Sequence, residues 1–256
     1  MKQLITILAI AVMLIATPKV HAQTLIPSIP VLMYHRIQNC PTNTTDCADI
    51  TVQPVEFKAQ MDYLKANGYA TLSIDELMFC NKYGLPLPPK SVLVVFDDGY
   101  ATTYTQAYPI LKANGQKATM FMVSGLINAS GMLTDTQLKE MQRTGVFNIE
   151  SHTVTHVRLS PLTQAQRIIE LRDSQAALQN LLNVPVRYIA YPNGDINDTS
   201  VLDVKQYYDL GFIVCKVNCH KGDNSRLMPL NGDLFRMERV TVFPKTDEAT
   251  FKMMLE

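Results

Sequence analysis

The 256-residue sequence contains no tryptophan, no excess of either charge and no internal repeat. Its 23 basic and 23 acidic residues give a formal net charge of zero, and the basic residues form no stripe along the chain. Binding to a nucleic acid or to an anionic membrane surface would favour such a stripe, so neither is expected as a partner. Because tryptophan is absent, any aromatic surface that stacks on a ligand has to come from tyrosine or phenylalanine.

The N-terminus carries a short hydrophobic run in place of a full membrane span. Met1-Lys2-Gln3 is followed by an uncharged run from Leu4 to Ala16 and then by Val20-His21-Ala22. A basic start, a short apolar run and a small-residue site are typical of a secretory signal peptide. We therefore expect residues 1–22 to be cleaved, 23–29 to form a linker and 30–256 to fold as one domain. The mature protein is then periplasmic or secreted, without stable membrane insertion; the alternative is a retained N-terminal anchor.

Cysteines are few, and none has the C-x-x-C spacing of a common metal site. Cys40 and Cys47 bracket a polar loop, and Cys215 and Cys219 form a second local pair. In an exported protein such pairs favour disulfides, so we expect Cys40–Cys47 and Cys215–Cys219 bridges, with Cys80 unpaired.

Strand and helix patterns alternate along the chain. Apolar runs predict strands at residues 30–35, 69–72, 91–96, 117–123, 146–149, 185–191, 212–217 and 236–243. Helical spacing of apolar residues predicts helices at 55–67, 74–83, 104–111, 135–143, 163–182 and 202–210. The alternation implies a mostly parallel sheet, either open or closed into a barrel, and the pattern alone does not choose between them.

Two adjacent carboxylates close one predicted strand. Asp97 and Asp98 directly follow the buried run 91–96, and carboxylates so close resist joint ionisation unless a cation is near. His152 and His156 lie four residues apart, a spacing that places both imidazoles on one face of a helical turn. One aspartate and two histidines give three metal ligands and leave a coordination position open, as in a catalytic site. Zinc is the expected ion, and cobalt, nickel or manganese also accept these ligands.

These motifs carry a family resemblance. The segments Val95-Phe96-Asp97-Asp98-Gly99 and His152-Thr153-Val154-Thr155-His156 resemble the polysaccharide deacetylases of carbohydrate esterase family 4, the NodB homology domain. The opening Ile29–Ile37 and the later Ala190–Gly194 look like the branch that includes bacterial poly-N-acetylglucosamine deacetylases. The resemblance implies a single-domain, distorted (β/α) barrel with its site where the strands end.

The resemblance also implies a role for each motif residue. Asp98, His152 and His156 match the family's metal ligands, and Asp97 matches its catalytic base. By the same resemblance, a backbone N–H stabilises the oxyanion of the tetrahedral intermediate near Tyr191, Pro192 and Asn193.

The sequence departs from the family pattern at two places. Ala190 stands where the family usually has an arginine that orients the base, so Arg187 or Arg239 would have to substitute from another direction. The alternative for each of these arginines is a surface ion pair. The family's Asp-Trp element is missing as well.

Cleavage of an amide also needs a general acid, and histidines are scarce. Of the five, His21 lies in the predicted signal peptide and two are predicted ligands, which leaves His35 and His220. The family usually places a Leu-x-His strand near the C-terminus, where this chain has none. Leu32-Met33-Tyr34-His35 resembles that motif in the permuted order of the poly-N-acetylglucosamine branch, so His35 is the expected acid. Its alternative is a core histidine bonded to a backbone carbonyl.

Three functions are compatible with these features. The expected one is metal-dependent N-deacetylation of an N-acetylglucosamine-containing polysaccharide. A close alternative is an O-acetyl esterase acting on a cell-wall or plant glycan, whose alcohol leaves more easily than an amine. The third is a glycan-binding protein without turnover, but binding alone does not need a metal site beside a base.

Overall fold

The computed structural model describes residues 29–40, 50–214, 233–244 and 246–255. The predicted signal peptide, His220, Cys47, Cys215 and Cys219 lie outside these residues, and each predicted disulfide includes at least one of them. Cys80 has a free thiol, as expected. Among the described residues, no helix is long and apolar enough to cross a membrane.

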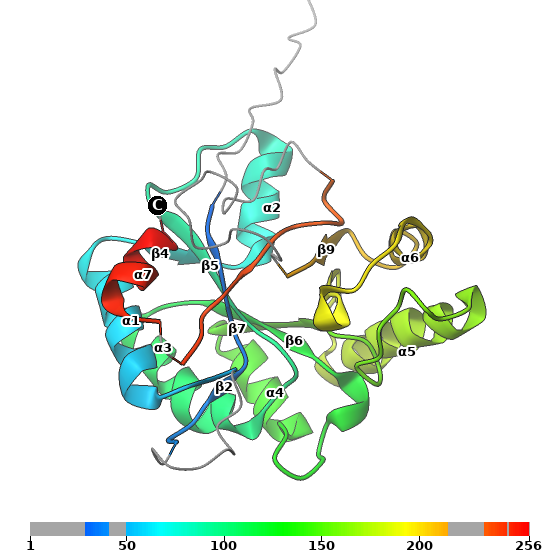
Figure 1. Cartoon of the computed structure of the whole chain (residues 1–256), viewed down its shortest axis with the longest axis horizontal. Coiled ribbons are helices and arrows are strands. Elements are labelled where there is room, and N and C mark those ends of the chain that lie inside the picture. The colour runs from blue at the N-terminus through cyan, green and yellow to red at the C-terminus, as the bar shows by residue number, and fades with distance from the viewer. Residues whose placement is uncertain (1–28, 41–49, 215–232, 245, 256) are drawn as a thin grey trace, which may run out of the picture.

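A curled parallel sheet forms the centre of the described structure (Figure 1). Its strands are β1 (Val31–Tyr34), β4 (Ala70–Leu72), β5 (Ser91–Phe96), β6 (Ala118–Met122), β7 (Phe147–Ser151), β8 (Tyr188–Ala190), β9 (Leu210–Phe212) and β10 (Val240–Thr241). The strand order is β10-β1-β5-β6-β7-β8-β9, and β4 pairs with the first half of β5. A separate parallel pair joins β2 (Arg36–Ile37) to β3 (Thr51–Val52).

The last part of the chain closes the sheet toward a barrel. Met237 exchanges backbone hydrogen bonds with residues of the β9 edge, donating to the Gly211 carbonyl and accepting from Ile213. A few residues later, Val240 of β10 pairs with Leu32 of β1, at the other edge. One segment therefore contacts both edges of the sheet. The distorted barrel expected from the family resemblance is confirmed.

Helices cover the outside of the sheet, as Figure 1 shows for α1, α3, α4 and α5. The helices are α1 (Pro54–Ala66), α2 (Ile74–Tyr83), α3 (Tyr108–Asn114), α4 (Asp135–Arg143), α5 (Gln164–Leu182), α6 (Asp198–Val204) and α7 (Glu248–Met253). A π-helical segment (Thr103–Ala107) precedes α3, and short 3₁₀ turns occupy Ser124–Leu126 and Pro192–Gly194. Side-chain caps fix several starts; the Ser73 hydroxyl, for example, accepts the N–H of Glu76 at the start of α2.

The sequence misplaced two elements near the end of the barrel. A helix was expected at 202–210 and a strand at 212–217, whereas α6 begins at Asp198 and β9 runs over Leu210–Phe212. The reason is a cap: the Asn197 side chain accepts the N–H of Ser200 and starts the helix earlier. Pairing of Leu210 with Tyr188 then fixes the strand.

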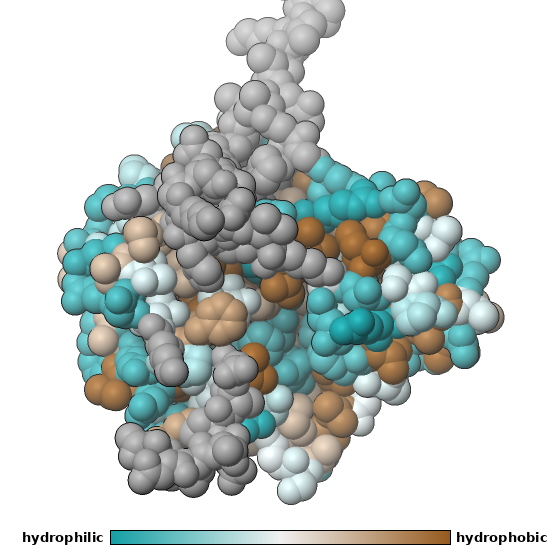
Figure 2. Space-filling model, in the orientation of Figure 1, coloured by the Kyte–Doolittle hydropathy of each residue, from teal (hydrophilic) through white to brown (hydrophobic). Residues whose placement is uncertain are grey.

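Alternate strand residues pack into two separate cores. On β5, Val92, Val94 and Phe96 belong to the core that also contains apolar residues of α1, α3, α4 and α5. Leu93 and Val95 belong to the second core, which joins the strands inside the barrel to Ile74 and Leu77 of α2. Successive residues of a strand point to opposite faces of the sheet. This alternation therefore predicts which residue just after each strand points into the barrel. On the coloured surface of Figure 2, hydrophilic and hydrophobic residues alternate in small groups.

Candidate active site

Three polar side chains extend the inward-facing rows of the strands. Tyr34 pairs with Phe96, and both point outward, so the next residues, His35 and Asp97, fall on the inward side of β1 and β5. His152 follows β7 on the same inward alternation. Arg239 precedes β10, but its long side chain reaches Asp97. We call this end of the barrel, where the parallel strands finish, the mouth. Ligands and catalytic groups of such folds gather there.

Asp98 and the two histidines form a cluster suited to one metal ion. The Asp98 Oδ1 atom lies 3.6 Å from Nε2 of His152 and 3.3 Å from Nε2 of His156. A tetrahedral ion with bonds of about 2.0–2.2 Å places its ligand atoms about 3.4 Å apart, close to the observed separations. Among the described residues this is the group of His, Cys, Asp and Glu able to hold a metal.

Hydrogen bonding in the cluster leaves the right atoms free for a cation. The Nδ1 atom of His152 lies 2.7 Å from the carbonyl oxygen of Ala190, which fixes the ring and directs Nε2 toward Asp98. Asp98 Oδ1 is buried and has no hydrogen-bond partner in the described part of the chain. A buried carboxylate oxygen without a donor is costly, and a metal ion would satisfy it. The residues therefore fit a divalent ion.

The turn after β5 aims the two aspartates in different directions. Asp98 has a left-handed backbone, with φ of 71°, and Gly99 follows with φ of 96°. Glycine suits this left-handed conformation, and a Cβ on Gly99 would also displace the flexible end of the Met122 side chain. A left-handed aspartate costs of order 1–3 kcal/mol, and such strain is characteristic of functional sites.

Arg239 holds Asp97 from the opposite side. Both side chains are buried, and Nη1 of Arg239 donates to Oδ1 of Asp97 at 2.6 Å. Burial acts to raise the pKa of Asp97, but the charges of Arg239, His152 and His35 outweigh it and lower that pKa to about 2. The carboxylate is thus held ionised, with its second oxygen 3.8 Å from Nε2 of His152.

The two candidate arginines occupy different places. Arg239 is fully buried, donates from Nε to the carbonyl of Ile213 and lies over the ring of Phe121. Arg187 precedes β8, at the end of the strands opposite the mouth, and is exposed. Of the two, the structure therefore brings Arg239 to Asp97.

His35 stands beside Asp97 with one ring nitrogen unused. The backbone N–H of Asp97 donates to the carbonyl of Tyr34, which places His35 next to Asp97. Nδ1 of His35 is buried and has no partner among the described residues. The carbonyl bond that would mark a purely structural histidine is therefore not made by Nδ1.

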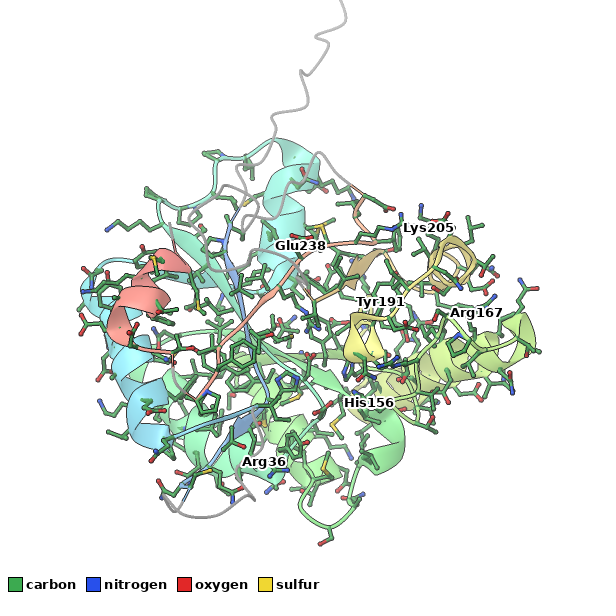
Figure 3. The ribbon with its side chains drawn as sticks, viewed as in Figure 1. Arg36, His156, Arg167, Tyr191, Lys205 and Glu238 are labelled. Carbon is green, nitrogen blue, oxygen red and sulfur yellow. The ribbon has the colours of Figure 1, made fainter. Side chains whose placement is uncertain are left out.

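The loop after β8 contains the three residues 191–193, near which a backbone N–H was expected to bind the oxyanion. The N–H of Tyr191 already donates to the Phe212 carbonyl, and Pro192 has no N–H. Asn193 has a left-handed backbone, with φ of 58°, and its N–H makes no backbone hydrogen bond within the described residues. Figure 3 shows Tyr191 beside the Pro192–Gly194 turn. Its buried ring packs against Gly211, where a Cβ would come within 2.7 Å of it.

The expected helical turn between the two histidines is wrong. Residues 152–156 form a loop in which Thr153 and His156 have positive φ values of 68° and 62°. Side chains of α5 hold this loop: Glu170 accepts the N–H groups of Val154 and Thr155, each at 2.9 Å. These tertiary bonds replace the helical bonds that the spacing alone implied.

Comparison with known proteins places this fold and site in one family. A family model described as polysaccharide deacetylase matches residues 84–210. YxkH of Bacillus subtilis (strain 168), which is named as a polysaccharide deacetylase, is 34% identical over 229 residues, covering 89% of this chain and 76% of that protein. This chain belongs to the polysaccharide deacetylase family.

Other members of the family resemble the chain in sequence and in structure. The poly-beta-1,6-N-acetyl-D-glucosamine N-deacetylase of Staphylococcus aureus (strain MSSA476) is 28% identical over 197 residues, which cover 68% of each chain. The Streptococcus pyogenes deacetylase PplD, solved in complex with acetate, is 30% identical with a TM-score of 0.81, covering 91% of this chain and all of that one. A Bacillus anthracis polysaccharide deacetylase has 30% identity and a TM-score of 0.77, covering 90% and 69%.

Some residues that support this candidate site were not evident from the sequence. Glu170 belongs to the buried face of α5 together with Leu171 and Leu178, and a carboxylate on such a face was the available signal. Arg36, labelled with His156 in Figure 3, lies 4.5 Å from the ring of Tyr100. Burial and the charge of Asp98 raise the pKa of Tyr100, so this tyrosine stays a neutral donor beside Asp98.

Proposed function

We propose that this polysaccharide deacetylase removes N-acetyl groups from an N-acetylglucosamine-containing polysaccharide by metal-dependent hydrolysis. The proposal rests on the cluster of Asp98, His152 and His156. The ionised carboxylate of Asp97 lies beside this cluster, and so does the side chain of His35. The staphylococcal relatives, which are named for a β-1,6-linked N-acetylglucosamine polymer, support the substrate class.

Three residues would hold the metal. The nitrogen and oxygen donors of Asp98, His152 and His156 suit zinc, with cobalt, nickel or manganese as alternatives. Bound there, the ion supplies a Lewis acid that polarises the acetyl carbonyl and makes water a stronger acid at neutral pH.

The chain's own residues account for the proton transfers. Asp97, oriented by Arg239, accepts the proton of the attacking water. The Asn193 N–H is the proposed donor to the oxyanion that forms at the carbonyl. His35 then donates a proton to the amide nitrogen as the C–N bond breaks, so that acetate and a free amine leave. Amines are poor leaving groups, which is why this last step needs an acid.

The test is acetate release from two matched substrates. We expect the purified chain to release acetate from a β-1,6-linked N-acetylglucosamine oligomer and to do so less efficiently from an O-acetylated xylan oligomer. A chelator should abolish both activities, and added zinc or cobalt should restore them. Release from the ester alone would assign the chain to O-deacetylation, and release from neither would leave a glycan-binding role.

The same proposal includes export to the periplasm or the medium. Its basis is the N-terminal pattern of residues 1–22. N-terminal sequencing of the mature protein should begin at Gln23. Peptide mapping without reductant should find the Cys40–Cys47 and Cys215–Cys219 bridges, and a bridge that includes Cys80 would refute this pairing.

A further inference from the structure

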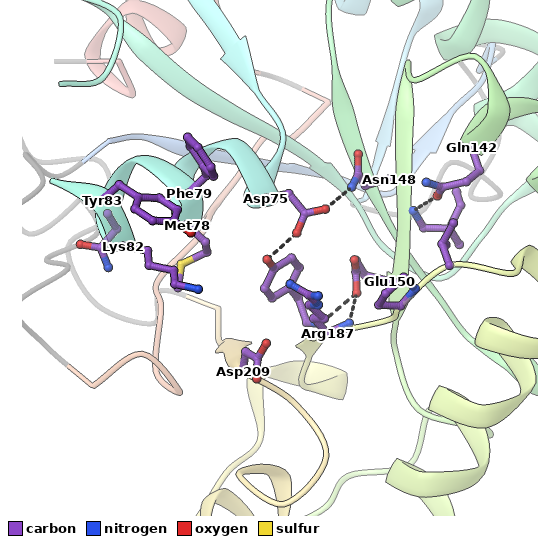
Figure 4. Close-up of a pocket in the computed structure, with 15 residues that line it drawn as sticks. Asp75, Met78, Phe79, Lys82, Tyr83, Gln142, Asn148, Glu150, Arg187 and Asp209 are labelled. Carbon is purple, nitrogen blue, oxygen red and sulfur yellow. Dashed lines mark hydrogen bonds between the residues drawn. The ribbon is translucent and has the colours of Figure 1, made fainter. Parts of the chain in front are cut away.

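A second cavity lies away from the proposed metal site. It has a volume of about 700 Å³ and opens between α2 and the segments around β7 and β8 (Figure 4). Arg187, directly before β8, belongs to its lining, whereas Asp97, Asp98, His152 and His156 do not. Its size is within the range of about 300–1,000 Å³ that is usual for ligand pockets.

One wall of this cavity is a buried carboxylate with an unused oxygen. Glu150 is only 2% exposed, and its Oε2 accepts the N–H groups of Arg187 and Tyr188, each at 2.9 Å. Its other oxygen makes no hydrogen bond within the described residues, although Glu150 lines the cavity. A ligand hydroxyl or amide in the cavity can form a hydrogen bond with this oxygen.

Two further planar groups are ready for hydrogen bonding in the same cavity. Asp75 is fixed by the Tyr188 hydroxyl at 2.6 Å and by the Asn148 amide at 3.2 Å. The guanidinium of Arg187 has no side-chain ion pair among the described residues, and it borders the cavity as well. Figure 4 shows Asp75, Arg187 and Glu150 grouped near the centre of the view, with Phe79 and Tyr83 of α2 to one side. Such fixed polar groups give a pocket its specificity.

An exposed aromatic pair forms the outer part of the cavity. Phe79 and Tyr83 lie one helical turn apart on α2, and their ring centroids are 4.7 Å apart. Each is 56% exposed, although large aromatic side chains are usually covered. A pyranose ring has one face of C–H groups that packs on an aromatic ring, while its hydroxyl groups reach planar polar side chains.

The charges around the cavity exclude other ligands. The two basic side chains of the lining, Lys82 and Arg187, do not outnumber its acidic residues Asp75, Asp209 and Glu150, so the lining has no excess of positive charge for a phosphate or a nucleic acid. We propose that this cavity is a second polysaccharide-binding site, which holds a segment of the polymer while another segment reaches the mouth. The inference rests on the proposed function for the choice of a hexosamine polymer. Holding one segment raises the local concentration of the next, as in bivalent binding.

The test separates polymer binding from turnover. The double variant Phe79→Ala/Tyr83→Ala is compared with the unchanged chain by affinity electrophoresis in gels that contain soluble β-1,6-linked N-acetylglucosamine polymer, with a chelator present to stop the reaction. We expect the apparent Kd for the polymer to rise about tenfold, the equivalent of losing one good stacking contact. Hydrolysis of 4-nitrophenyl acetate, measured with metal, should not change.

Matched controls decide the outcome. Ile169→Ala removes an apolar side chain of similar exposure from α5 and should leave polymer binding unchanged. An unchanged Kd in the double variant, or an equal loss in Ile169→Ala, overturns the inference. Acetate release by the unchanged chain is scored separately. Polymer binding that depends on Phe79 and Tyr83 without acetate release sinks the proposed function alone, and acetate release with an unchanged Kd sinks the second site alone.

Discussion

The barrel interior holds two buried carboxylates, and burial affects them in opposite ways. At the mouth, the charge of Arg239 and of two histidines overcomes burial, and the pKa of Asp97 falls to about 2. Deeper in the barrel, burial raises the pKa of Glu150 to about 8, although two backbone N–H groups bond it. Backbone donors alone therefore do not keep a buried carboxylate ionised, whereas a buried guanidinium does.

The largest expected effect comes from neutralising the carboxylate at the mouth. Asp97→Asn should lower the rate of acetate release by about a hundred- to ten-thousand-fold, because an amide cannot accept the proton of water. Metal content, measured by mass spectrometry of the native protein, should stay at one ion per chain. If metal content falls together with activity, Asp97 is a ligand and the assigned role is wrong.

The second-largest effect is expected from removing Arg239, the buried cation that Asp97 has and Glu150 lacks. Arg239→Leu leaves Asp97 buried without its partner and should lower the free energy of unfolding by about 3–5 kcal/mol. Arg187→Leu is the matched control and should cost far less, because Arg187 is exposed. Urea unfolding of both variants measures the difference. Adding Asp97→Asn to Arg239→Leu should recover part of the loss, and no recovery would mean that the pair is not coupled.

Loss of His35, beside Asp97, should slow the cleavage of poor leaving groups more than the cleavage of good ones. His35→Ala is expected to lower hydrolysis of an N-acetylglucosamine oligomer about a hundredfold, since the amine has to be protonated as it leaves. An activated ester such as 4-nitrophenyl acetate needs no such proton and should be hydrolysed almost normally. Equal losses on both substrates would give His35 a structural role, and a selective loss in His220→Ala would transfer the acid to His220.

A smaller effect is expected from the helix that supports the ligand loop. Glu170→Gln loses the charge that binds the N–H groups of Val154 and Thr155, so His152 and His156 should be held less firmly. Metal affinity, measured by competition with a chromogenic chelator, should fall about tenfold. Glu140→Gln changes a carboxylate that bonds only tyrosine hydroxyls on α3 and the π-helical segment, and it should leave metal affinity unchanged.

The smallest effect on stability is predicted for a change at Glu150, deep in the barrel. Glu150→Gln keeps an oxygen that accepts the N–H groups of Arg187 and Tyr188, and no buried cation depends on its charge. The free energy of unfolding should therefore change by less than about 1 kcal/mol, far less than for Arg239→Leu. A loss as large as that of Arg239→Leu would show that the charge of Glu150 matters to the fold.

The sequence predicted the site wherever strand period and motif agreed. The apolar run before Asp97 gave β5 with its full length, and inward alternation brought His35, Asp97 and His152 to one end. The expected turn between His152 and His156 was wrong because contacts with Glu170, distant in the sequence, override local spacing. The choice between Arg187 and Arg239 also required the fold, since β10 reaches β1 only when the sheet curls.

The segment that closes the barrel, around Arg239 and β10, lies near the end of the chain. Arg239 contacts Asp97 across 142 residues of sequence, and it does so on the segment that joins the last strand to the first. A chain still being synthesised has its aspartates and histidines long before it has the arginine that keeps Asp97 ionised. On the proposed roles, a prematurely terminated chain would carry the metal ligands without the arginine that orients the base.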